Sequence, residues 1–114
     1  MSGHAPAAYH WKMQRLSAIG LIPLTLWLIL SVASLASADY VTVHQWISTP
    51  LTTTLLILFV TLSGYHAILG IQVILEDYLN ESTCSKLFSA IRLLMMLTAA
   101  LSLIAIFQIS LENL

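Results

Sequence analysis

Three long stretches without a charged side chain constrain this sequence more than any other feature. No Asp, Glu, Lys or Arg occurs in residues 16–38, 40–75 or 93–111. Each stretch reaches the roughly 17–25 residues that an α-helix needs to cross the hydrocarbon core of a bilayer. The chain is 59% hydrophobic and 8% charged, whereas a soluble domain has about 25% charged residues. We therefore predict an all-α integral membrane protein with three transmembrane helices.

The three spans leave too few residues for a separate water-soluble domain. We expect them at about residues 15–37, 50–77 and 86–110, in one membrane domain that covers residues 1–114. Proline at position 50, after a serine and a threonine, is typical of a helix start. Because the connectors are short, any chemistry in water must come from partner subunits.

Lysine and arginine occur at one end of the predicted bundle. Lys12 and Arg15 precede the first span and Lys86 and Arg92 follow the second connector, whereas the first connector and the C-terminal tail have neither residue type. The positive-inside rule then places the N-terminus inside and the C-terminus outside. Residues 1–14 lack the features of a secretory signal or a transit peptide. We therefore expect a bacterial inner membrane rather than a mitochondrial one.

The charge and cysteine content exclude several functions. With a net charge of -1 and no basic run, the chain has no patch that could neutralise nucleic-acid phosphates. Cys84 is the single cysteine, so the chain cannot form an internal disulfide or supply the four thiolates of an iron–sulfur cluster. We expect a free thiol in a reducing compartment.

One histidine lies deep in the second span. His66 is nine residues before Leu75, about 14 Å from the inner end of the helix and close to the centre of the bilayer. Imidazole at that depth can relay protons, bridge two helices by a hydrogen bond, or ligate heme iron as a neutral base. Gly70 is one turn further on the same face, where it allows either a flat macrocycle or another helix to approach.

A second polar feature marks the inner end of the same helix, at Glu76, Asp77 and Tyr78. Carboxylates at a helix C-terminus oppose the macrodipole, so these groups are either simply solvated or face a cation or a polar substrate. A tyrosine at headgroup depth is usually part of an aromatic belt, but its hydroxyl can also donate to a quinone carbonyl. Tyr78 is twelve residues from His66, about 18 Å along the axis.

Residues 66–78 resemble the H-x-x-x-G-x-x-x-x-x-x-D-Y signature of the small hydrophobic membrane anchor of succinate dehydrogenase, respiratory complex II. Residues 15–18 are similar to the R-x-[ST]-A pattern with which the first helix of that family begins. The length and the three spans agree over essentially the whole chain. The spacing from the histidine to the Asp-Tyr pair is the most specific part of the match.

The resemblance implies a role for each matching residue. His66 would be an axial ligand to the iron of a b-type heme, with the other ligand supplied by a second anchor subunit. Tyr78 would hydrogen-bond ubiquinone, Asp77 would belong to the quinone region, and Arg15 would lie near the heme propionates.

The implied protein is the membrane anchor of succinate:ubiquinone oxidoreductase, which links the tricarboxylic acid cycle to electron transport in the respiratory chain. It would pair with the second anchor subunit in the lipid bilayer, bind the flavoprotein and iron–sulfur subunits, and perform no reaction alone. The residues by themselves leave two alternatives: a cofactor-free scaffold of another membrane complex, and a transporter component with His66 and Asp77 as a proton relay.

Overall fold

The computed structural model describes residues 7–112, which form four helices. These are α1 (Ala7–Ser34), α2 (Tyr40–Ser48), α3 (Pro50–Tyr78) and α4 (Glu81–Glu112). Helices α1, α3 and α4 are long and apolar enough to cross a membrane, because a helix satisfies its own backbone polar groups inside lipid. The prediction of an all-α protein with three spanning helices is confirmed. Helices α1 and α4 each begin at least one turn before the hydrophobic stretch expected from the sequence.

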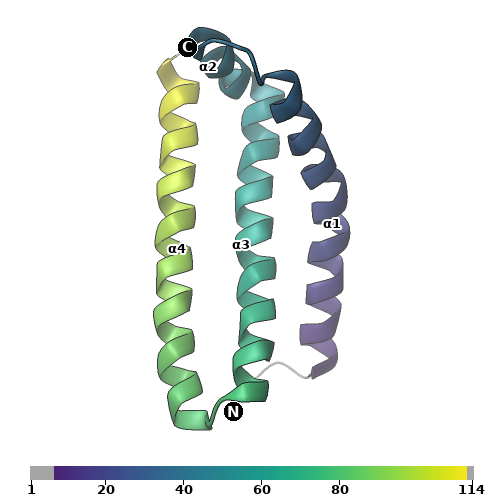
Figure 1. Ribbon diagram of the computed structural model, residues 1–114, viewed down its shortest axis with the longest axis vertical. Coiled ribbons are helices and arrows are strands. Elements are labelled where there is room, and N and C mark those ends of the chain that lie inside the picture. Colours follow the sequence, from purple (N-terminus) through teal and green to yellow (C-terminus); the bar gives the residue numbers. More distant parts are fainter. Residues whose placement is uncertain (1–6, 113–114) are drawn as a thin grey trace.

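The three long helices lie side by side as one layer, with α3 in the middle (Figure 1). Helix α3 packs against both α1 and α4, and no contact between α1 and α4 is found within residues 7–112. The molecule is 49 Å long, which exceeds the ~30 Å hydrocarbon core. The helix ends therefore extend into the headgroup layers on both sides.

Few side chains are buried between the helices, and many large apolar side chains face outward. Among the described residues, the buried ones are Leu69 and Cys84 together with the hydroxyl residues Ser17, Thr52 and Thr53. Many leucines and isoleucines of the long helices are exposed on the isolated chain. This is the arrangement of a membrane protein, in which lipid or partner helices cover the apolar surface and close helix packing selects small residues.

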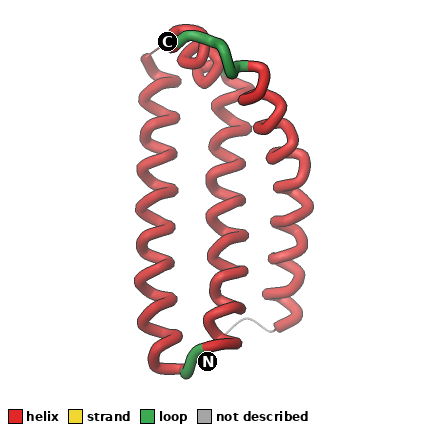
Figure 2. The backbone as a smooth tube through the Cα atoms, viewed as in Figure 1, coloured by secondary structure: helices red, strands yellow, loops and turns green. Residues whose placement is uncertain are grey.

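The first connector is more ordered than the sequence indicated. No helix was predicted there, but residues 40–48 form α2, which caps the end of the layer where α4 also ends (Figure 2). Asp39 starts this helix by accepting a hydrogen bond from the amide of Thr42 at 2.9 Å, and hydrogen bonding by Thr42 holds the pKa of Asp39 below its ordinary value.

Tertiary contacts also hold α2 in place. The Thr53 hydroxyl of α3 donates to the carbonyl of Ile47 at 2.6 Å, and the rings of Trp46 and Trp27 stack with centroids 5.9 Å apart. The missed helix thus depends on one local cap and on tertiary contacts with α1, α3 and α4.

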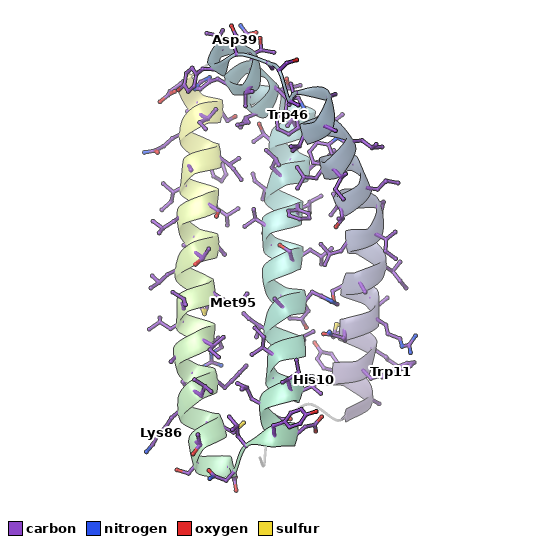
Figure 3. All side chains as sticks on the ribbon, in the orientation of Figure 1. His10, Trp11, Asp39, Trp46, Lys86 and Met95 are labelled. Carbon is purple, nitrogen blue, oxygen red and sulfur yellow. The ribbon has the colours of Figure 1, made fainter. Side chains whose placement is uncertain are left out.

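The two ends of the layer differ in charge. Figure 3 shows His10, Trp11 and Lys86 toward one end and Asp39 and Trp46 at the other. The start of α1 and the connection from α3 to α4 share the first end (Figure 1). The lysines and arginines of the sequence belong to these segments or to the helical turns beside them, so the charge asymmetry behind the predicted orientation is present in the fold.

Candidate functional site

His66 of α3 contacts α1 through one hydrogen bond. Its Nδ1 atom lies 2.8 Å from Oγ of Ser17, a residue that is only 3% exposed. The Ser17 hydroxyl also donates to the carbonyl oxygen of Gln14, one turn earlier in α1, at 2.9 Å. Among the described residues, none forms a hydrogen bond with the other ring nitrogen, Nε2. Of the two ring nitrogens of His66, Nδ1 is therefore hydrogen-bonded, whereas Nε2 has no partner among the described residues.

A cavity of about 1080 Å³ opens beside His66. It is lined by the first turns of α1, by α3 from His66 to its C-terminal end, and by the start of α4. A volume of this size matches the largest of the ~300–1,000 Å³ sites that usually hold small molecules and cofactors. His66, Gly70 and Arg15, which the sequence singled out, all line it. The fold thus brings two predicted site residues, His66 and Arg15, together with Gly70 around one space.

The surroundings of Gly70 agree with both interpretations of this residue, the close approach of another helix and the close approach of a flat macrocycle. A Cβ atom built on Gly70 would lie 3.3 Å from Nε2 of the Gln14 side chain, so the glycine admits the neighbouring amide of α1. Gly70 also lines the cavity. The Gln14 Oε1 atom is buried and has no hydrogen-bond partner within residues 7–112. Buried acceptors normally have partners, so this oxygen, in a residue that lines the cavity, fits a site that a further group completes.

Arg15 is exposed at the rim of the cavity. Its guanidinium carbon lies 4.6 Å from the centroid of the Trp11 ring, a cation–π contact that holds the side chain near the membrane surface. Arg92, by contrast, lies over Phe88 of its own helix at 5.6 Å and is not among the residues that line the cavity. Of the two arginines, Arg15 is placed to meet an anionic group bound beside His66.

The C-terminal end of α3 contributes to the cavity through a residue other than the predicted pair. Glu76 lines the cavity and accepts a hydrogen bond from the Gln72 side chain at 3.0 Å. Asp77 is exposed and Tyr78 is 83% exposed, and neither belongs to the cavity lining. The chain therefore keeps the Asp-Tyr pair on its surface at the inner end of α3, apart from the space beside His66.

Two residues of the site were not singled out from the sequence for their chemistry. Ser17 and Gln14 lie close to the start of the predicted first span. In the sequence, Ser17 stands out only as part of the R-x-[ST]-A pattern. The signal that identifies it is the contact with His66, which requires the relative rotation of α1 and α3.

Comparison with known proteins identifies the family. The model of the succinate dehydrogenase/fumarate reductase transmembrane subunit family matches residues 2–107. The succinate dehydrogenase hydrophobic membrane anchor subunit of Rickettsia bellii is 33% identical over 104 residues, covering 88% of this chain and 81% of the relative. The subunit of the same name from Rickettsia typhi is 30% identical over 104 residues, with coverages of 91% and 81%. No solved structure matches the chain significantly.

Proposed function

The chain belongs to the succinate dehydrogenase/fumarate reductase transmembrane subunit family, and on that premise we propose that it is the hydrophobic membrane anchor of a succinate dehydrogenase in a bacterial inner membrane. The related proteins from two Rickettsia species carry that name, and each is about 30% identical to this chain over most of its own length and of this chain. The three apolar helices agree with such a role. The rest of the enzyme, a flavoprotein, an iron–sulfur protein and a second anchor subunit, would assemble around it.

The observation that carries the proposal is the position of His66 between Ser17 and the cavity. A neutral imidazole with one ring nitrogen hydrogen-bonded and the other unengaged is the form in which histidine binds heme iron. We assign His66 as one axial ligand of a b-type heme, with the second ligand from the partner anchor subunit. Arg15 at the rim would bind the propionates, and Gly70 would leave room for the ring.

The residues present fit such a group. The cavity lining contains the His66 imidazole, a glycine at position 70 that leaves space for a flat ring, and a cation, Arg15, at the rim. Heme supplies reversible one-electron transfer when it is bound. The chain would hold the macrocycle, exclude water from it and set the orientation of its imidazole ligand.

The quinone site belongs at the inner end of α3. Tyr78 is highly exposed on the isolated chain, so its hydroxyl can reach a ubiquinone carbonyl in a pocket that the partner subunits complete. Asp77 beside it would take part in proton delivery to the same region. A positioned hydroxyl of this kind favours reduction, because it donates to an oxygen that gains negative charge.

The exposed faces of the helix layer support assembly with partners. Large apolar side chains on all three long helices are exposed, including Leu26, Val73 and Leu97. Lipid covers some of this surface, and a second anchor subunit would cover the side that completes the cavity. The flavoprotein and the iron–sulfur protein would dock at the end that carries the cations.

Affinity purification of the tagged chain from bacterial membranes in mild detergent tests the proposal. We expect the flavoprotein, the iron–sulfur protein and a second small membrane subunit to purify with it, together with succinate–quinone reductase activity. Purification of the folded chain with an unrelated membrane complex and no succinate oxidation would contradict the proposal.

A further inference from the structure

The hydrogen bonds around Ser17 favour one of the two neutral tautomers of His66. A serine hydroxyl has one proton to donate, and Ser17 donates it to the Gln14 carbonyl at 2.9 Å. With that proton on the Gln14 carbonyl, the contact of 2.8 Å between Ser17 Oγ and His66 Nδ1 is a bond in which the ring N–H donates to the hydroxyl oxygen. A neutral imidazole has only one N–H group, so Nε2 keeps its lone pair.

From this geometry we propose that Ser17 is a positioning residue that holds His66 as the Nδ1–H tautomer and thereby presents the Nε2 lone pair as the iron ligand. The inference rests on the proposed function, since it assigns a role to Ser17 through His66. The chain of bonds runs from the His66 ring to the Ser17 hydroxyl and from that hydroxyl to the Gln14 carbonyl, so it links α3 to the backbone of α1.

Burial makes this arrangement stable. Ser17 is 3% exposed, so water cannot compete for its hydroxyl, and breaking the bond would leave buried polar atoms without partners. The bond also fixes the orientation of the imidazole ring, because Nδ1 must point at α1. His66 remains part of the cavity lining, which leaves its other edge for a ligand.

A hydrogen bond accepted from the distal ring nitrogen of a metal-binding histidine raises the electron donation of the ring to the metal. Stronger donation favours the ferric over the ferrous iron. Removing the acceptor should therefore raise the midpoint potential of the heme, whereas a residue that only fills space between helices would leave that potential unchanged.

The test compares the purified succinate dehydrogenase complex carrying Ser17→Ala, Ser17→Thr or the control Ser63→Ala. Ser63 is on α3 three residues before His66, and its hydroxyl donates to the carbonyl of Val60 in the same helix at 3.2 Å. Threonine keeps a hydroxyl that can bond the carbonyl one turn earlier. Optical redox titration and low-temperature electron paramagnetic resonance report the potential and the ligand field of the heme.

We expect Ser17→Ala to shift the ferric-to-ferrous equilibrium toward ferrous heme by up to tenfold, about 59 mV for a one-electron couple. Its resonance spectrum should move as well, and Ser17→Thr and Ser63→Ala should remain at the wild-type values. An unshifted potential and spectrum in Ser17→Ala, with heme lost in His66→Ala, would overturn the role of Ser17 and leave the proposed function intact. An unchanged six-coordinate heme in His66→Ala would overturn the ligand role of His66 in the proposed function and, with it, the role of Ser17.

If the alanine variant fails to assemble, Ser17→Cys tests whether Ser17 affects the heme potential. A thiol is a weak acceptor of similar size, so this variant should assemble and show a shift in the same direction. A wild-type potential in Ser17→Cys would contradict the inference.

Discussion

The Oγ atom of Ser17 on α1 lies 2.8 Å from the Nδ1 atom of His66 on α3, although 49 positions separate the two residues in the chain. This bond is one of the contacts that join the first two spanning helices, and it lies beside the cavity. It orients an imidazole in the lining of the cavity, and it leaves the second ring nitrogen for a ligand. The same pair therefore contributes to the packing of α1 against α3 and to the candidate cofactor site.

Replacement of Tyr78 by phenylalanine should weaken quinone reduction without changing succinate oxidation. The substitution removes one hydroxyl donor, and a typical hydrogen bond contributes about 0.5–1.5 kcal/mol, or roughly two- to tenfold in rate. We expect a decrease of that size in succinate–ubiquinone activity, with succinate–dye activity unchanged. Tyr40→Phe is the matched control, because Tyr40 is 79% exposed at the opposite end of the layer. Equal quinone kinetics in the two variants would contradict a contact between Tyr78 and the quinone.

Arg15→Gln should lower the heme midpoint potential, in the opposite direction to Ser17→Ala. Arg15 lines the cavity, and a positive charge near the iron disfavours the ferric state, so its loss should favour that state. Heme occupancy should also fall, because the propionates lose a cation. Redox titration and the heme-to-flavin ratio measure the two effects. Arg92→Gln, whose guanidinium lies over Phe88, should leave both unchanged, and equal behaviour of the two variants would exclude a propionate contact at Arg15.

A larger side chain at position 70 should reduce heme incorporation. In Gly70→Val the new atoms would press on the Gln14 amide, which is 3.3 Å from the position of a Cβ atom, and would enter the cavity. Gly64→Val is the control on the same helix, since no atom lies within 4 Å of a Cβ atom there. We expect the heme-to-flavin ratio of the purified complex to fall only in the Gly70 variant. Normal occupancy in Gly70→Val would show that the macrocycle does not approach this glycine.

The sequence predicts the parts of this protein that depend on composition and helical spacing. Charge-free stretches indicate three spans, and the four-residue step from His66 to Gly70 places both residues on one face, where the structure has them lining one cavity. Arg15 was also expected near the same site, and the cavity brings it there. These features follow from the length of a membrane crossing and from 3.6 residues per turn.

Contacts between helices could not be predicted from the sequence. The Ser17–His66 bond requires the rotation and axial register of α1 against α3, which helical periodicity within one segment does not define. Helix α2 was missed because a nine-residue segment has little helical stability by itself. Its N-terminal cap at Asp39 is local, whereas the contacts of Thr53 and Trp46 are tertiary.

The absorption spectrum of the purified complex with and without the His66 imidazole tests the central claim most directly. The wild-type complex should show the Soret and α bands of a six-coordinate b-type heme, and His66→Ala should lose them or convert them to a five-coordinate spectrum. His44→Ala, on α2 at the other end of the layer, should keep the wild-type bands. A His66→Ala complex that assembles with an unchanged six-coordinate spectrum would contradict the assignment of His66 as the heme ligand.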